Sequence, residues 1–151
     1  MTDKKIVYID MDDTLADFMG AYVSAREEKP EMAFPQAEYG FFANLKPLED
    51  AIESVQNLLD SNHLSPYVLT APSTVNPLCY TEKRIWVEQH LGMEMVERLI
   101  ISPDKSLLKG DYLIDDIAEG KGQEGFEGEL IQFGTLAYPD WRAVMGYFLK
   151  A

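Results

Sequence analysis

Residues 5–14, KIVYIDMDDT, join an apolar run to three carboxylates, those of Asp10, Asp12 and Asp13. An apolar run without polar alternation is typical of a strand that is buried on both faces of a parallel sheet. Carboxylates that crowd the end of such a strand repel one another unless a proton or a cation lies among them. This stretch therefore predicts a buried strand whose carboxyl end carries a functional site.

Short apolar runs rich in Val, Ile and Tyr predict further strands at residues 66–70, 98–102, 111–115 and 129–134. Helical patterns occur at residues 48–61, at residues 81–92 and from Pro139-Asp140 through WRAVMGYFLK. The second of these helices is expected to have Thr81 as its N-cap and to end at Gly92. Alternating strands and helices predict an α/β fold with a doubly wound parallel sheet, whose ligand crevice lies beyond the carboxyl ends of the strands.

A segment at about residues 16–47 interrupts this alternation. It is punctuated by Pro and Gly and is rich in aromatic residues, namely Phe18, Tyr22, Phe34, Tyr39, Phe41 and Phe42. We expect a small helical cap, inserted over the crevice of a single domain that spans residues 1–151. An equally good interpretation of the aromatic residues at 34–42 is a small core beneath the cap, without any ligand.

The net charge restricts the partners. Thirteen basic and twenty-six acidic side chains give a formal charge of -13, which repels nucleic-acid polymers and anionic membranes. A small anion is still compatible with this charge, because a few lysines can dominate the potential inside one cleft. The single cysteine, Cys79, forms no internal disulfide, and the N-terminus lacks the pattern of a signal peptide. We therefore expect a cytoplasmic protein, with its oligomeric state open.

A second acidic pair, Asp115-Asp116, ends the predicted strand at 111–115. The carboxyl ends of parallel strands meet at one edge of a sheet, so this pair is expected to lie near the first acidic cluster. Carboxylate oxygens are the ligands that Mg²⁺ prefers. The sequence therefore predicts a magnesium site at this edge.

Residues near the same edge have the types that hydrolysis of a phosphate ester requires. A carboxylate such as Asp10 attacks the phosphorus only when the negative charge of the phosphoryl oxygens is neutralised. Thr70 ends a predicted strand, Lys83 lies on the next helix, and Lys105 follows the next strand. Asp12 points the same way as Asp10 along an extended chain, so it can serve as general acid and then general base. Taken singly, Lys83 is more often a solvated helix lysine, and Thr70 can simply end its strand.

The order of these motifs carries a resemblance. Asp10-x-Asp12-x-Thr14 follows the first strand, Thr70 ends the second, a lysine follows, and Asp115-Asp116 ends a later strand. This order resembles the haloacid dehalogenase (HAD) superfamily of aspartyl-phosphate phosphatases over nearly the whole chain. More narrowly, the stretches DMDDTLADF, EKRIWVEQHLG and ISPDKSLLKGDYLIDD are similar to the 5'(3')-deoxyribonucleotidase family. The resemblance implies a HAD-like (Rossmann-like) sheet and a Mg²⁺-dependent phosphomonoesterase that acts on (deoxy)ribonucleoside monophosphates.

The resemblance also implies a role for each acidic residue. Asp10 would be the nucleophile and a Mg²⁺ ligand, and Asp12 would be the acid/base and bind the metal through its backbone carbonyl. Asp116 would be the remaining protein ligand, with Asp115 supporting it. Asp13 stands where the family usually has Gly, which adds charge near the metal.

The implied substrate side consists of four residues. Thr70 and Lys105 would hold the phosphate, with Lys83 nearby as a second cation. Phe18 matches an aromatic residue that stacks on the nucleobase. The cap is shorter than in the animal enzymes of this family, which leaves base selectivity open.

Three other interpretations compete with a nucleotidase. One is a phosphatase of another small phosphate ester. The second is a receiver-like signalling domain, which would need a phosphate-accepting aspartate on a central strand, whereas Asp60 lies in a helical pattern. The third is a catalytically silent protein that binds a nucleotide or a protein. The match of GKGQEG at 120–125 to a dinucleotide fingerprint is rejected, because no helix follows it, and we predict a flexible loop there.

Overall fold

The computed structural model describes residues 3–149. Its five strands form one parallel sheet in the order β3-β2-β1-β4-β5. They are β1 (Lys5–Ile9), β2 (Leu64–Thr70), β3 (Leu99–Ile101), β4 (Tyr112–Asp115) and β5 (Glu129–Gln132). The chain builds β2 and β3 on one side of β1 and then β4 and β5 on the other, which leaves a crevice at the carboxyl end of β1. The predicted doubly wound parallel α/β sheet is confirmed.

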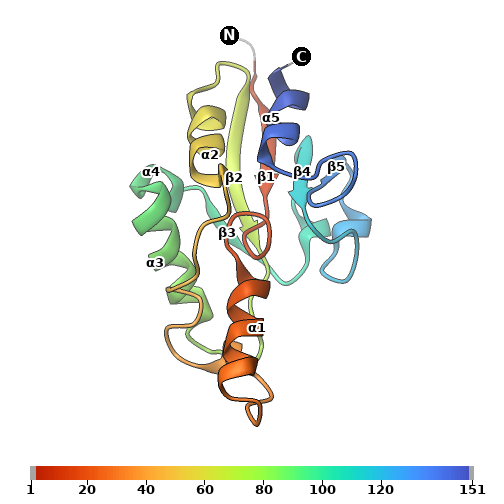
Figure 1. Cartoon of the computed structure of the whole chain (residues 1–151). Helices are drawn as coiled ribbons and strands as arrows, with labels where there is room; N and C mark the ends of the chain where they lie inside the picture. The colour runs from red at the N-terminus through yellow and green to blue at the C-terminus, as the bar shows by residue number, and fades with distance from the viewer. Residues whose placement is uncertain (1–2, 150–151) are drawn as a thin grey trace.

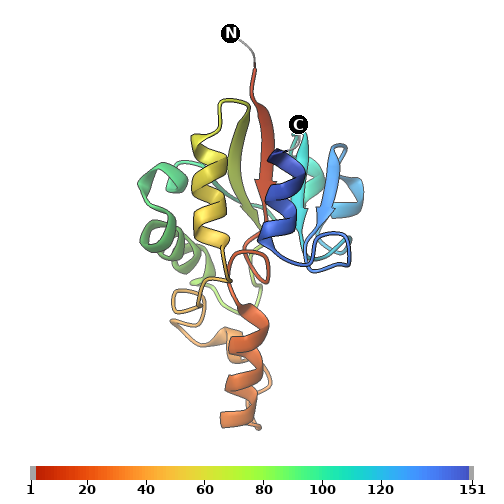
Figure 2. The same ribbon diagram turned by 45° about the horizontal axis from the view of Figure 1, so that its top comes forward.

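Helices and 3-10 turns make the connections. They are α1 (Phe18–Glu28), α2 (Ala51–Asp60), α3 (Cys79–Leu91), α4 (Met93–Val96), α5 (Trp141–Leu149), η1 (Pro35–Ala37), η2 (Lys105–Leu107) and η3 (Gln123–Gly125). In Figures 1 and 2, α2 and α5 lie side by side over one face of the sheet. The helix predicted at 48–61 is confirmed and is a few residues shorter than its pattern. The helix predicted after Pro139 is confirmed over residues 141–149, and its predicted end at Lys150 lies outside the described residues.

The start of α3 differs from the prediction. The helix begins at Cys79, so Thr81 lies inside its first turn and the prediction of Thr81 as N-cap is wrong. The turn before the helix explains this difference, because Asn76 accepts the backbone N–H of Leu78 on its side chain at 3.0 Å and that of Cys79 on its carbonyl at 3.1 Å. The end is as predicted, since Gly92 follows the helix with a positive φ of 91°.

The alternation of side chains divides the core between the two faces of the sheet. Val7 and Ile9 of β1 belong to the larger cluster, which α2, α3 and α5 cover. Tyr8, between them, belongs to a smaller cluster with Leu69, Leu113 and Phe126 on the opposite face. The strand is therefore buried on both faces, as its unbroken apolar run predicts.

The cap segment (residues 16–47) leaves the sheet after β1 and returns before α2. Its two ends pair with each other, because the N–H of Asp17 donates to the carbonyl of Lys46 at 2.8 Å and Ala16 forms a bridge with Pro47. Helix α1 projects from the body of the molecule in both ribbon views. No residue of α1 is fully buried, so contacts elsewhere hold the segment in place.

Three buried side chains fasten the cap segment to the body of the molecule. Asn76 donates to the carbonyls of Gln36 and Glu38 at 2.9 and 3.3 Å, and the Trp86 indole donates to that of Leu45 at 2.8 Å. The Glu82 carboxylate, only 5% exposed, accepts three backbone N–H groups, from Gly40 at 2.9 Å, Phe42 at 3.0 Å and Ala43 at 3.2 Å. The cap segment is thus hydrogen-bonded along residues 36–45.

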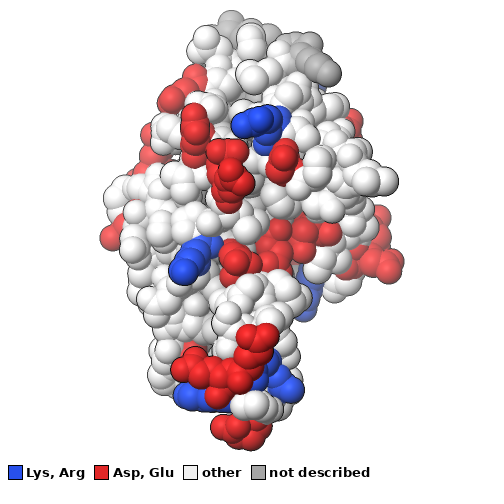
Figure 3. Space-filling model, in the orientation of Figure 1, with Lys and Arg blue, Asp and Glu red and all other residues white. Residues whose placement is uncertain are grey.

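The surface reflects the composition. Acidic side chains are widespread on the face shown in Figure 3, where basic side chains are fewer. Within residues 3–149, no helix has both the length and the apolar character that crossing a bilayer requires. The expectations that nucleic-acid polymers and membranes are not partners, and that the protein is cytoplasmic, stay predictions.

Candidate active site

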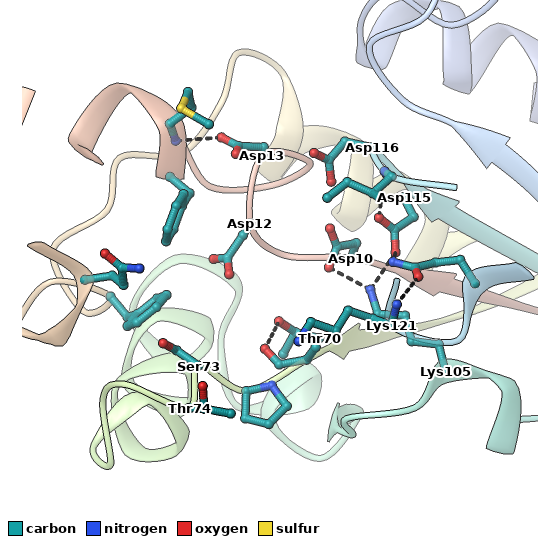
Figure 4. A pocket seen from close by; sticks show the side chains of 18 of the residues that line it. Asp10, Asp12, Asp13, Thr70, Ser73, Thr74, Lys105, Asp115, Asp116 and Lys121 are labelled. Carbon is teal, nitrogen blue, oxygen red and sulfur yellow. Dashed lines mark hydrogen bonds and ion pairs between the residues drawn. The ribbon is translucent and has the colours of Figure 1, made fainter. Parts of the chain in front are cut away.

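The carboxyl ends of β1, β2 and β4 and the cap segment enclose a cavity of about 390 Å³ (Figure 4). The cavity brings together most of the predicted site residues, since its lining contains Asp10, Asp12, Phe18, Thr70, Lys105, Asp115 and Asp116. Lys83 is absent from this lining. It is 0% exposed and lies behind Asp12 and Thr70, so its interpretation as a solvated lysine is wrong.

Three carboxylates form a cluster that fits a divalent cation. Asp10, Asp115 and Asp116 each place an oxygen within 4.8 Å of the others, and Asp10 and Asp115 are buried. Burial and then the negative charges of Asp10, Asp115 and Asp13 raise the pKa of Asp116 to about 8. Clustered carboxylates of this kind favour a proton or a cation among them, and hard oxygen ligands suit Mg²⁺.

Lys105 joins the ends of β1 and β4. Its ammonium donates to Asp10 Oδ1 at 2.9 Å and to Asp115 Oδ2 at 2.6 Å, and it is only 1% exposed. Burial alone would lower the pKa of Lys105, but the charges of Asp10 and Asp115 outweigh it and raise that pKa. Lys105 therefore stays a cation, and its two bonds leave one ammonium proton without a partner in the described part of the chain.

The Asp115 carboxylate is taken up mainly by hydrogen bonds from protein donors. Besides Lys105, its carboxylate accepts the side-chain N–H of Gln123 at 3.2 Å and the backbone N–H of Ile117 at 3.0 Å. Both of its oxygens are therefore occupied. Asp10 accepts Lys105 on Oδ1 and a long bond from Thr14 Oγ1 at 3.4 Å on Oδ2, and Asp116 accepts only a long bond from Thr14 Oγ1 at 3.5 Å within residues 3–149, so Asp116 is the carboxylate that is freest to bind a metal.

A second lysine lies on the other side of the cavity wall. The Lys83 ammonium donates to Thr70 Oγ1 and to the Ala71 carbonyl, each at 2.6 Å, and to Asp12 Oδ2 at 3.2 Å. It also lies 5.3 Å from the ring centroid of Phe42. Burial raises the pKa of Asp12, although the Lys83 charge opposes this shift.

Asp13 has a conformational role. Its φ of 59° lies in the left-handed region, which Gly adopts freely and Asp tolerates, so the position suits the Gly that the family usually has. The Asp13 side chain turns toward α1 in Figure 4 and accepts the backbone N–H of Met19 at 2.8 Å. Burial raises its pKa. Its charge is therefore directed to the start of α1 and away from Asp10.

The far end of the cavity is aromatic. Phe18 is half-buried and lines the cavity, and it packs against Phe41 and Phe42 with ring centroids 5.4 and 5.9 Å apart. Phe42 is only 1% exposed, so it belongs to the core as well as to the cavity wall. Of the aromatics at 34–42, Phe42 is part of the main core and Phe41 packs against it, whereas a role in ligand binding stays a prediction. Phe34 and Tyr39, at 56% and 73% exposed, are in neither place.

Sequence reasoning missed several residues of the lining, among them the stretch 71–75 after β2, Gln36 and Lys121. Gln36 enters it from the cap segment, with a buried side-chain oxygen that has no hydrogen-bond partner in the described chain. Lys121 lines the cavity from the GKGQEG stretch, and its backbone is hydrogen-bonded to Lys105 and Gln123. The Lys121 carbonyl accepts the N–H of Lys105 at 2.7 Å, and its N–H donates to Gln123 at 2.7 Å. We predicted a flexible loop there, and the only sequence signal for this turn is its glycines, Gly120 and Gly122, both at positive φ.

Comparison with known proteins finds relatives of this chain. A family model described as 5' nucleotidase, deoxy (pyrimidine), cytosolic type C protein matches residues 28–138. A protein of Vibrio phage KVP40, named as a 5'(3')-deoxyribonucleotidase, is 40% identical over 97% of this chain and 85% of its own length. The human cytosolic-type 5'(3')-deoxyribonucleotidase is 33% identical over 78% of this chain and 73% of its own length.

A solved structure supports the fold alone. The HAD-hydrolase YfnB from Bacillus subtilis, bound to magnesium, superposes with a TM-score of 0.61 at 10% identity. The match covers 97% of this chain and 99% of that one.

Proposed function

The chain belongs to the 5'(3')-deoxyribonucleotidase family of HAD-like hydrolases acting on phosphoric monoesters, and we propose that it dephosphorylates deoxyribonucleoside monophosphates with Mg²⁺ and a phospho-aspartyl intermediate on Asp10. The observation that carries this proposal is the ion pair between the Lys105 ammonium and the Asp10 carboxylate, 2.9 Å long. It lies at one end of the cavity, and the other end is aromatic. A buried carboxylate beside a cation suits a phosphate, and an aromatic wall suits a nucleobase.

In the first step, an oxygen of Asp10 attacks the phosphorus atom. A bond forms between Asp10 and phosphorus, and the bond between phosphorus and the nucleoside oxygen breaks. Asp12 gives its proton to the leaving oxygen, which departs as the nucleoside hydroxyl. Thr70 and Lys105 donate hydrogen bonds to the phosphoryl oxygens, and thereby stabilise their charge as it shifts.

In the second step, water attacks the phosphorus of the phospho-aspartyl group. Asp12, now a carboxylate, takes a proton from this water, and the Asp10 carboxylate is released with inorganic phosphate. Asp10 and Asp116, with the Asp12 backbone carbonyl, would hold the Mg²⁺. When bound, that cation supplies positive charge against the phosphate and the carboxylates.

The aromatic end gives the substrate class. Phe18 would stack on the base, with Phe42 behind it and the Gln36 carboxamide available to a polar edge of the base. The family description names pyrimidine deoxynucleotides, so we infer dUMP and dTMP as the first substrates to test. The partner is then a small phosphorylated molecule.

The decisive experiment is turnover of a panel of phosphomonoesters, with Mg²⁺ and with a chelator, by the wild type and Asp10→Asn. We expect the variant to fold and to lose at least about 10³-fold in kcat. Intact-mass measurement after acid quench should find one phosphoryl group on the wild type and none on the variant. Undiminished turnover by Asp10→Asn would show that Asp10 is not the nucleophile. Faster turnover of a non-nucleotide ester than of any nucleotide would show that the proposed substrate class is wrong.

The structure disfavours the receiver-like alternative. Asp60 is the last residue of α2, just before β2 starts. It therefore lies near the amino ends of the strands, whereas Asp10 lies at their carboxyl ends. A receiver-like acceptor is thus missing from the cavity. A catalytically silent protein is the outcome that an absence of turnover on the whole panel would support.

A further inference from the structure

Lys83 has contacts that differ from those of a phosphate-binding lysine. An ammonium group has three protons to donate, and Lys83 places all three on protein acceptors, Thr70, Ala71 and Asp12. Lys105, by contrast, has two acceptors in the described part of the chain, which leaves one of its protons available there. Lys105 is therefore the lysine that can donate to a phosphate, and Lys83 could do so only by giving up an existing bond.

The contacts of Asp12 point to what Lys83 does. Lys83 is the only donor within residues 3–149 that hydrogen-bonds the Asp12 carboxylate, through Oδ2 at 3.2 Å. The other oxygen, Oδ1, is buried and has no partner there. Without Lys83, no hydrogen bond would fix the orientation of this side chain, which is 29% exposed to the cavity.

The two short bonds anchor the lysine itself. Thr70 Oγ1 and the Ala71 carbonyl, both at the end of β2, hold the ammonium at 2.6 Å each. The stem is 0% exposed, and the ring of Phe42 lies 5.3 Å from the charge. The ammonium is thus fixed on the sheet and presents its third proton to Asp12.

We propose that Lys83 is a positioning residue for the reaction: anchored on Thr70 and Ala71, it holds the Asp12 carboxylate in the orientation that gives a proton to the leaving oxygen and later takes one from the attacking water. This inference rests on the proposed function. It differs from the role expected from the resemblance, in which Lys83 is a second cation for the phosphate.

The test is Lys83→Met, which keeps the length of the side chain and removes its donors. Two substrates separate the roles, since the nucleoside oxygen of dUMP needs a proton in order to leave and the phenolate of p-nitrophenyl phosphate does not. We expect kcat/KM for dUMP, which reports the steps up to departure of the nucleoside and not the later hydrolysis that both esters share, to fall about 10²-fold, the range of general acid catalysis, with KM changed less than about threefold. The loss with p-nitrophenyl phosphate should be at least about tenfold smaller. In an Asp12→Asn background, Lys83→Met should add less than about threefold.

Two outcomes would overturn the inference. One is a raised KM with kcat retained, which marks a phosphate contact, and the other is an equal loss on both esters. Arg84→Met is the matched control, because Arg84 is exposed on α3 and, among residues 3–149, pairs only with Glu88. Circular dichroism and thermal melts establish folding, and Lys83→Gln gives the same comparison of esters if the Met variant does not fold. A wild type without turnover on any ester would instead remove the proposed function, and this inference with it.

Discussion

Glu82→Ala should destabilise the protein by about 3 kcal/mol, because the cap segment loses its buried acceptor. In the wild type, three backbone N–H groups donate to this carboxylate at 2.9, 3.0 and 3.2 Å. Hydrogen bonds to a charged acceptor contribute about 1.5–3 kcal/mol each, which would total about 4.5–9 kcal/mol.

Two effects reduce that total. Burial of a carboxylate costs several kcal/mol, which Ala avoids. Gly40 and Ala43 are half-buried, so water can reach their N–H groups after a small movement. The N–H of Phe42 remains, since Phe42 is 1% exposed, and a buried donor without an acceptor costs about 1–3 kcal/mol.

Urea unfolding at equilibrium measures this change, with the fluorescence of the buried Trp86 and Trp141 as the signal. Glu82→Gln keeps one acceptor oxygen and should lose about half as much. Glu88→Ala, on the exposed side of the same helix, is the control and should change stability little. A Glu82→Ala protein within 1 kcal/mol of the wild type (a threshold of about one ordinary hydrogen bond) would refute the view that Glu82 fastens the cap.

Gly122→Ala should destabilise the protein by about 2–3 kcal/mol and lower kcat, because Gly122 has a φ of 89° and an added Cβ would lie 2.6 Å from the backbone N of Lys105. Gly120→Ala, at a φ of 106° with open space around the Cβ, has only the conformational cost, about 1 kcal/mol. The unfolding temperature of the metal-free protein should fall as pH rises from 4 toward 8, because the raised pKa of Asp116, about 8, keeps a proton in the folded chain that the unfolded chain has lost. Mg²⁺ needs the deprotonated carboxylate, so it should stabilise the folded protein more at pH 8.5 than at pH 6, the two sides of that pKa. At pH 8.5, Mg²⁺ at ten times its dissociation constant should add about 1.4 kcal/mol to the free energy of unfolding.

Clear outcomes would contradict these last expectations. Equal losses for Gly120→Ala and Gly122→Ala would mean that contact with the Lys105 backbone is unimportant. An unfolding temperature that is insensitive to Mg²⁺ in the wild type, or equally sensitive in Asp116→Asn, would exclude Asp116 as a ligand.

The sheet could be predicted from the sequence because its signals are local. The apolar run before Asp10 has no polar alternation, and a strand buried on both faces requires this pattern. The pair Asp115-Asp116 ends a run of the same kind, and parallel strands bring such ends together. A single acidic motif also occurs at the strand ends of unrelated folds. The order of several such motifs along the chain is what indicates this fold.

The missed features depend on contacts between distant residues. The sequence around Lys83 resembles an ordinary helix surface, and its burial results from Asp12, 71 residues earlier in the chain. Glu82 likewise binds the backbone of Gly40, Phe42 and Ala43, which precede it by 39 to 42 residues. The Lys121 turn is specified by a backbone bond to Lys105, which no side-chain pattern reveals. Such contacts follow from the packed structure, and periodicity and composition carry no record of them.

Adjacent residues on α3 have unrelated tasks, since Glu82 binds the cap segment and Lys83 binds Asp12 and Thr70. One helix thus sets the distance between the aromatic wall of the cavity and the Asp12 carboxylate. A foreign cap grafted between β1 and α2 would keep this alignment only if it offered α3 a matching set of amide donors. New substrate preferences in this scaffold should therefore arise more easily by exchanging side chains that face the cavity than by exchanging whole caps.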